Sequence, residues 1–202
     1  MKRFANRQEA GRALAARLAD RSWHDPLVLG LARGGVPVAK EVAAVLHAEL
    51  DVVVARKIGV PGHPEYGVGA VTADGNPIYD QHTLRSLNLT EDQLAHVCDQ
   101  ERAEAERRTA LYRDDKPLTI TGRDVILVDD GLATGVTAKA ALRWISGHGP
   151  GSTTLAVPVS ARASLDGTPV VAVLLPKDFR AVSRWYDSFG QTTDAEVLSA
   201  LE

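Results

Sequence analysis

Short apolar runs alternate along the chain with segments whose apolar residues recur at helical spacing. The runs hold mostly aliphatic and β-branched residues and carry no charge, which is typical of strands buried on both faces of a sheet. They cover residues 27–32, 52–55, 66–72, 125–128, 154–159 and 170–175. Helices are predicted over residues 8–19, about 36–47, 90–112 and 138–145, with a short one ending at 201. This alternation predicts an α/β fold with a mostly parallel central sheet flanked by helices.

Two parts of the chain depart from this pattern. Glu and Arg dominate residues 90–112, where Thr90 and Gln93 form a capping box at the start of the predicted helix. Few of these side chains are apolar, so we predict a protruding, solvated helix within a lid segment at about residues 75–116. The tail, at about residues 176–202, is predicted to form a small variable hood. We expect a single domain over residues 1–202.

Composition narrows the class of protein. A chain of 202 residues with 45% hydrophobic content is long enough for one core. The formal net charge of −3 shows no basic excess, so nucleic-acid binding is not expected. No apolar run approaches the roughly 20 residues of a membrane span, so no membrane association is expected. Cys98 is the single cysteine, which fits a reducing compartment, and we expect a cytoplasmic location.

The most informative stretch follows the run at residues 125–128, which ends in the adjacent acids Asp129 and Asp130. Open α/β sheets bind ligands at the carboxyl ends of their strands. The loop from Gly131 to Thr137 then opens a predicted helix, whose first N–H groups favour an anion. This order of residues predicts a sugar phosphate, with its hydroxyls on the acids and its phosphate on the loop.

Two further groups of residues follow predicted strands. Arg33-Gly34-Gly35 comes after the first strand and opens a helix, and Arg56-Lys57 comes after the second, before a Pro/Gly-rich segment at residues 58–64 that predicts a loop. Because parallel strands place their carboxyl ends at the same edge of a sheet, we expect these groups to lie near the acids. Taken alone, the first group also fits an ordinary tight turn and the second a solvated loop.

Other nucleotide-binding classes fit less well. Gly30 to Gly35 is glycine-rich after a strand, but the G-x-G-x-x-G order of dinucleotide-binding oxidoreductases is absent. Asp51 precedes its strand, whereas the ribose-binding acid of that class belongs at the strand's carboxyl end. A kinase-type P-loop is excluded because the sequence has no G-x-x-x-x-G-K-[ST].

The stretch from Val125 to Thr137 resembles the phosphoribosyl pyrophosphate (PRPP) signature of type I phosphoribosyltransferases. Arg33-Gly34-Gly35 resembles that family's pyrophosphate loop, and Arg56-Lys57 its basic pair. The chain is most similar to the bacterial, functionally unassigned branch of the family. The resemblance implies transfer of ribose-5-phosphate from PRPP to a nitrogenous acceptor, such as a nucleobase or related heterocycle, with release of pyrophosphate. A non-catalytic PRPP or nucleotide sensor on the same fold is the alternative.

The resemblance also implies roles for individual residues. The catalytic set is Asp129, Asp130, Lys57 and Arg33. The PRPP-binding set is Arg33, Gly34, Gly35, Arg56, Lys57, Asp129, Asp130, Gly131, Ala133, Thr134, Gly135, Val136 and Thr137. Mg²⁺ is the expected cofactor; it would be carried by PRPP and reach Asp129 or Asp130 through water, with no direct protein ligand.

Three expectations concern the surroundings of this site. Aromatic residues of the tail are candidates for stacking on the acceptor ring: Phe179, Trp185, Tyr186 and Phe189. The family resemblance predicts a cis or strained bond between Arg33 and Gly34, and a homodimer. The partners are then PRPP, an unidentified small-molecule acceptor and a second copy of the chain.

Overall fold

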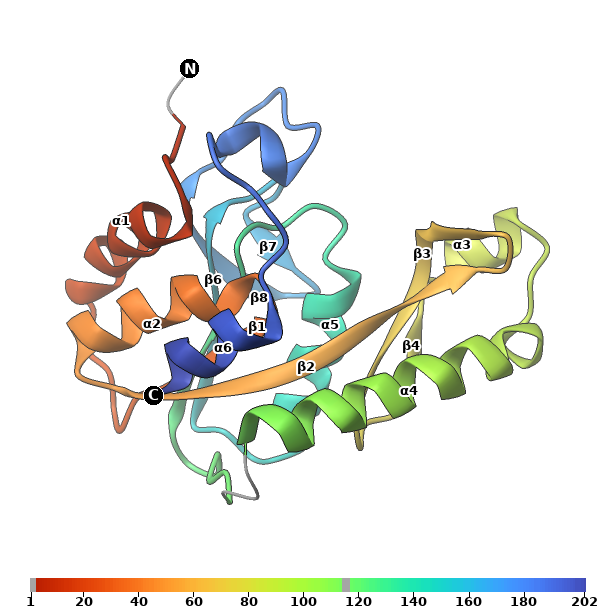
Figure 1. The fold of residues 1–202 in the computed structure, drawn as a ribbon, viewed down its shortest axis with the longest axis horizontal. Coiled ribbons are helices and arrows are strands. Elements are labelled where there is room, and N and C mark those ends of the chain that lie inside the picture. The colour runs from red at the N-terminus through yellow and green to blue at the C-terminus, as the bar shows by residue number, and fades with distance from the viewer. Residues whose placement is uncertain (1–2, 114–116) are drawn as a thin grey trace.

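The computed structural model describes residues 3–113 and 117–202, and within them the chain forms one continuous sheet covered by helices (Figure 1). The sheet order is β4-β3-β2-β1-β5-β6-β8-β7. The strands are β1 Leu27–Ala32, β2 Glu49–Val60, β3 His63–Thr72, β4 Ile78–Tyr79, β5 Asp124–Val128, β6 Ser152–Val159, β7 Ser164–Leu165 and β8 Thr168–Leu174. Strands β2, β1, β5, β6 and β8 pair in parallel, which confirms the predicted mostly parallel sheet.

Helices cover both faces of the sheet. They are α1 Arg7–Ala19, α2 Gly35–Leu46, α3 Gln81–Ser86, α4 Glu91–Arg113, α5 Val136–Ser146 and α6 Asp194–Leu201, with a short 3₁₀ helix η1 at Val182–Trp185. Alternate residues of β5 point to opposite faces. Val125 and Leu127 pack with α5, whereas Ile126 and Val128 pack with α1 and α2. The β5 strand is therefore buried on both sides, as its unbroken apolar sequence predicts.

The second strand is much longer than its apolar run. The sequence predicts a loop at residues 58–64, but β2 continues to Val60 and pairs antiparallel with β3. Gly59 makes this possible, because a Cβ there would overlap the backbone of Pro64. Figure 1 shows the resulting hairpin, together with β4 and α3, as an arm that projects from the body of the molecule.

Helix α4 lies along this arm (Figure 1). The capping box holds, since Thr90 N–H donates to Gln93 and Gln93 N–H to Thr90. The few buried apolar residues of the helix face the sheet, and Leu94, Cys98 and Ala105 are buried against β2 and β3. The helix is therefore a packed element with one buried stripe. Residues 114–116 of the predicted lid segment lie outside the described residues.

No helix in the described ranges is long and apolar enough to cross a membrane.

Helices α1 and α2 touch closely at Gly11. A Cβ on Gly11 would lie 2.8 Å from the Cβ of Glu41 and 2.9 Å from the carbonyl oxygen of Val38. Neither atom is the free end of a flexible side chain, so a methyl group there would push the two helices apart.

We therefore expect Gly11→Ala to lower the melting temperature. Overpacking should reduce the free energy of unfolding by about 1–3 kcal/mol. In an exposed helix the same change stabilises by about 1 kcal/mol, so the sign is diagnostic. Thermal unfolding followed by circular dichroism measures the effect. Ala16→Gly, at an exposed position of α1, is the control and should cost only about 1 kcal/mol. A higher melting temperature for Gly11→Ala would contradict the close helix contact.

Candidate functional site

The two acids lie directly beyond the carboxyl end of β5, at the edge where β1 also ends and from which β2 continues into the arm. The backbone N–H of Asp129 donates to the carbonyl of Ala156 on β6 at 3.3 Å. The N–H of Asp130 donates to the Asp129 carboxylate at 2.8 Å. The pairing of β5 with β6 thus continues to Asp129, and the Asp129 side chain in turn holds the backbone of Asp130.

Asp130 is fixed from outside β5 by Arg7, the first residue of α1. The Nε and Nη2 atoms of Arg7 lie 2.9 and 2.8 Å from Oδ2 of Asp130, and both side chains are largely buried. The hydroxyl of Tyr186 donates to the backbone carbonyl of Asp130 at 2.6 Å. Helical periodicity places Arg7 on the solvent side of its helix, so the sequence gives no sign of this contact.

The electrostatics of the two acids differ. Burial raises the pKa of Asp129 well above its usual range, and the negative charge of Asp130 raises that pKa further. Burial also raises the pKa of Asp130, but the Arg7 guanidinium beside it opposes the shift. Both acids therefore hold their protons more tightly than a free Asp does, and Arg7 partly stabilises the ionised form of Asp130 alone.

The loop after the acids is shaped by two glycines. Gly135 has a φ of 78°, a conformation that favours glycine, and it begins α5 as its N-cap. A Cβ on Gly131 would overlap the side chain of Val182 in η1. Thr134 is exposed beside the first turn of α5, whose free N–H groups suit an anion.

The Arg33-Gly34-Gly35 loop packs directly on the end of β5. A Cβ on Gly34 would overlap the carboxylate of Asp130, and one on Gly35 would overlap the carbonyl of Val128. The predicted cis or strained bond between Arg33 and Gly34 is wrong by one position. The cis bond joins Ala32 to Arg33, whereas Gly34 has ordinary right-handed helical angles.

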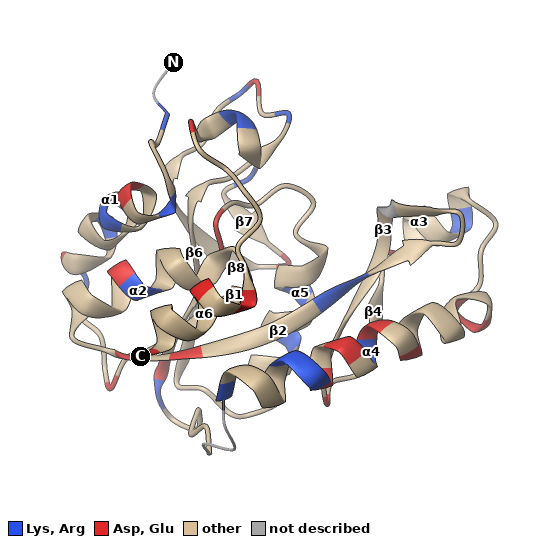
Figure 2. Cartoon of the chain, in the orientation of Figure 1, with Lys and Arg blue, Asp and Glu red and all other residues tan. Residues whose placement is uncertain are grey.

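Arg33 and the basic pair are held by surrounding residues. Arg33 forms an ion pair of 3.5 Å with Asp194 of α6. Arg56 and Lys57 point to opposite faces of β2 because side chains alternate along a strand. Arg56 donates to Glu101 of α4 at 2.8 Å, and the stem of Lys57 lies against Gly67 of β3. Figure 2 shows this basic segment in the middle of β2, across from acidic positions of α4.

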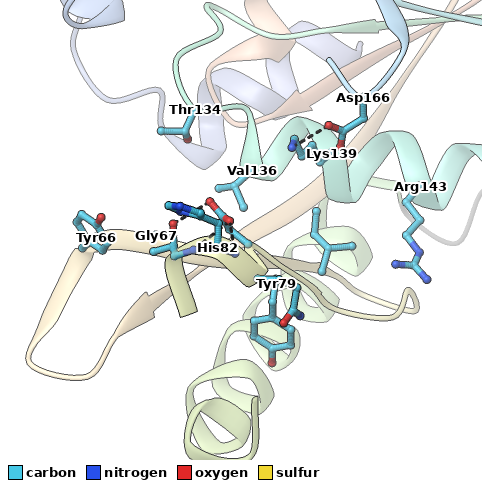
Figure 3. A pocket seen from close by; sticks show the side chains of 13 residues that line it. Tyr66, Gly67, Tyr79, His82, Thr134, Val136, Lys139, Arg143 and Asp166 are labelled. Carbon is cyan, nitrogen blue, oxygen red and sulfur yellow. Dashed lines mark hydrogen bonds and ion pairs between the residues drawn. The ribbon is translucent and has the colours of Figure 1, made fainter. Parts of the chain in front are cut away.

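A cavity of about 690 Å³ lies between the arm and the start of α5. Figure 3 shows Thr134 and Val136 on one side and Gly67 with His82 on the other. Lys139 also lines it and pairs with Asp166 at 2.9 Å. The cavity therefore connects the loop after the acids with the strand that supports Lys57.

Two of the four tail aromatics are buried, and the other two are partly exposed. Trp185 and Tyr186 are only 5% and 3% exposed, and they pack with Phe4. Phe179 and Phe189 are half-buried. The ring of Phe189 lies 4.8 Å from that of Tyr186 and 4.2 Å from the Arg7 guanidinium. Trp185 and Tyr186 are thus buried rather than open for stacking, and the Tyr186 hydroxyl supports the backbone of Asp130.

The acids do not belong to a protein-made metal cage. Among the side chains that the structure describes, which exclude Glu65, no group of three or more His, Cys, Asp or Glu is arranged to hold a metal ion. Mg²⁺ often binds through one or two carboxylates together with substrate phosphates, and the adjacent pair Asp129 and Asp130 fits that mode.

The raised pKa of Asp129 predicts how stability varies with pH. The folded protein binds this proton more tightly than the unfolded chain, so stability falls as the pH rises between the unfolded and folded pKa values. Asp129→Asn should therefore raise the melting temperature at pH 7. The gain should shrink towards about pH 4, where the unfolded-state carboxyl is itself half protonated. Calorimetric melting at both pH values measures this.

Asp124, at the other end of β5, is the matched control. It accepts hydrogen bonds from the His24 N–H and the Ser152 hydroxyl, both at 2.6 Å, and these lower its pKa. Asp124→Asn should therefore lower the melting temperature at pH 7. A loss of stability in Asp129→Asn at pH 7 would contradict the assignment.

The chain is similar to several known proteins. A Mycobacterium tuberculosis H37Rv protein named "Putative phosphoribosyl transferase" is 42% identical over 208 residues, which is all of this chain and 47% of that protein. A Clostridium novyi protein named "Bifunctional protein PyrR" is 30% identical over 66% of this chain and 56% of its own length. The chain thus spans about half the length of the curated relatives it matches.

A solved structure matches the fold over nearly its whole length. The TT1426 protein of Thermus thermophilus is 41% identical, with a TM-score of 0.81 over 98% of this chain and 97% of its own. The model of the phosphoribosyl transferase domain matches residues 3–168, which include both glycine loops, the basic pair and the acids. The chain therefore belongs to the phosphoribosyl transferase domain family.

Proposed function

We propose that this protein transfers ribose-5-phosphate from PRPP to a nitrogenous acceptor and releases pyrophosphate. The observation that carries the proposal is the contact between Gly34 and the Asp130 carboxylate. It brings the loop assigned to pyrophosphate against the acids assigned to ribose. The phosphate loop begins one residue further along the chain, so the three parts of a PRPP molecule meet matching groups at one edge of the sheet.

The reaction breaks the bond between ribose C1 and a pyrophosphate oxygen and forms a bond from C1 to the acceptor nitrogen. Positive charge develops on the ribose ring and negative charge on the leaving group. Asp129 and Asp130 would hold the ribose hydroxyls, and the ionised form of Asp130 would favour the cationic ring. Backbone N–H groups of the loop from Ala133 to Thr137 would hold the 5′-phosphate.

Arg33, Arg56 and Lys57 are assigned to the leaving pyrophosphate. Arg33 and Arg56 now pair with Asp194 and Glu101, so each would exchange a carboxylate for a phosphate. When bound with PRPP, Mg²⁺ supplies further positive charge at the pyrophosphate oxygens. A pyrophosphate group carries more negative charge in total than a carboxylate and accepts charge-assisted hydrogen bonds equally well, which favours the exchange.

We place the acceptor in the cavity beside Thr134, with a planar nitrogen heterocycle as the substrate class. The half-buried rings of Phe179 and Phe189 are not among the residues that line this cavity, so their stacking on the acceptor stays a prediction. Dimerisation and a cytoplasmic location remain predictions, and light scattering of the purified chain tests the first.

The ion pairs of Arg33 and Arg56 also suit a second function. A protein that binds PRPP or a nucleotide without turnover could use their release as its signal, since fold does not fix function. Turnover separates the two proposals: an enzyme releases pyrophosphate with some acceptor, whereas a sensor binds and releases PRPP unchanged.

Calorimetric titration with PRPP and Mg²⁺ should show binding, and Asp130→Asn should weaken it about 10-fold or more, as expected for a lost charge-assisted hydrogen bond. Asp124→Asn, on the same strand but at its far end, should bind like the wild type. Pyrophosphate release is then measured against purines, pyrimidines and amines.

Absence of PRPP binding by the wild type would overturn the proposal. Equal losses in both variants would show that the Asp130 result reflects strand stability alone. Binding that depends on Asp130, with no release on any acceptor, would favour the sensor.

A further inference from the structure

We propose that Arg7 is a positioning residue of this site, which acts through Asp130 and belongs to none of the three motifs. The inference rests on the proposed function. Arg7 begins α1, more than 120 residues before the acid that it contacts. Its side chain is 13% exposed, which is low for a surface helix position. The next arginine of the helix, Arg12, is 63% exposed and pairs with Glu41 at 3.7 Å.

Arg7 of α1 contacts two other segments of the chain, at Asp130 and at residues 189–190, and lies beside a third at Gly34. Two of its nitrogens contact Oδ2 of Asp130, and Nη1 donates to the carbonyl of Gly190 at 2.8 Å. The guanidinium also lies over the ring of Phe189, with 4.2 Å to the centroid. A Cβ on Gly34 would lie 3.5 Å from its Nε. The planar group is thus held on its edge and on its face.

This geometry leaves a defined task for Asp130. Because both Arg7 contacts fall on Oδ2, the other carboxylate oxygen, Oδ1, is the one that we assign to a ribose hydroxyl. Arg7 also offsets the negative charge beside Asp129, so two adjacent acids can face a ligand that is itself highly charged. A lysine could keep the charge but could not span the carboxylate and the Gly190 carbonyl in one rigid fork.

The alternative is a purely structural role, in which Arg7 stabilises the packing of α1 against the tail and has no effect on Asp130. The two roles differ in how substitutions combine. If Arg7 acts through Asp130, its substitution changes PRPP affinity little once Asp130 is also changed. If its role is independent, the two losses of affinity add. A double-mutant cycle on PRPP affinity therefore separates them.

The experiment measures PRPP dissociation constants by calorimetry, with Mg²⁺, for the full chain and its variants. Arg7→Met should weaken binding about 10- to 100-fold, within the range for losing a partner of a charged hydrogen bond. In the Asp130→Asn background the same change should cost no more than about threefold. Arg7→Lys should fall between wild type and Arg7→Met. Arg12→Met, on the same helix, should bind like the wild type.

Each result has one meaning. Additive losses in the cycle, or unchanged affinity in Arg7→Met, overturn the role of Arg7 while the proposed function stands. Failure of the wild type to bind PRPP overturns both. Melting temperatures are recorded for every variant, and if Arg7→Met does not fold, Arg7→Lys and its combination with Asp130→Asn complete the cycle.

Discussion

The contact between the loop after β1 and the carboxyl end of β5 is the constraint on which the rest of the site depends. These strands are parallel neighbours, with Gly30 beside Val128, so their following loops emerge side by side. Gly34 and Gly35 allow the two loops to touch, because a side chain at either position would overlap β5 or Asp130. The sheet thus places the loops, and the absence of two side chains sets their distance.

Burying the two acids lowers the stability of the fold, and the surrounding residues offset only part of that loss. Burial disfavours the ionised form of both, and Asp129 has the charge of Asp130 beside it. Arg7 and the hydroxyl of Tyr186 hold the second acid from behind. Groups with perturbed pKa values at the carboxyl end of a sheet are typical of functional sites, where chemistry maintains an arrangement that stability alone disfavours.

The sequence predicts the parts of this protein that depend on local pattern. The buried runs, the place of the acids and the loop before α5 follow from apolar periodicity and from glycine and proline positions. The extension of β2 to Val60 could not be predicted, because it depends on Gly59 meeting Pro64 across a hairpin. The burial of Trp185 and Tyr186 could not be predicted either, because it depends on their packing with Phe4 from the other end of the chain.

The basic side chains show most clearly why motifs describe a site incompletely. The family resemblance assigns Arg33 and Arg56 to the pyrophosphate but includes neither of their ion-pair partners. Arg33 pairs with Asp194 of α6, and Arg56 pairs with Glu101 of α4. These ion pairs are partly exposed, and such pairs contribute only about 0–1 kcal/mol each, so a phosphate can replace the carboxylate at small cost. Arg7 is different, because its partner is buried and part of the site itself. Residues outside the motifs therefore decide which charges of the site are fixed and which can exchange partners.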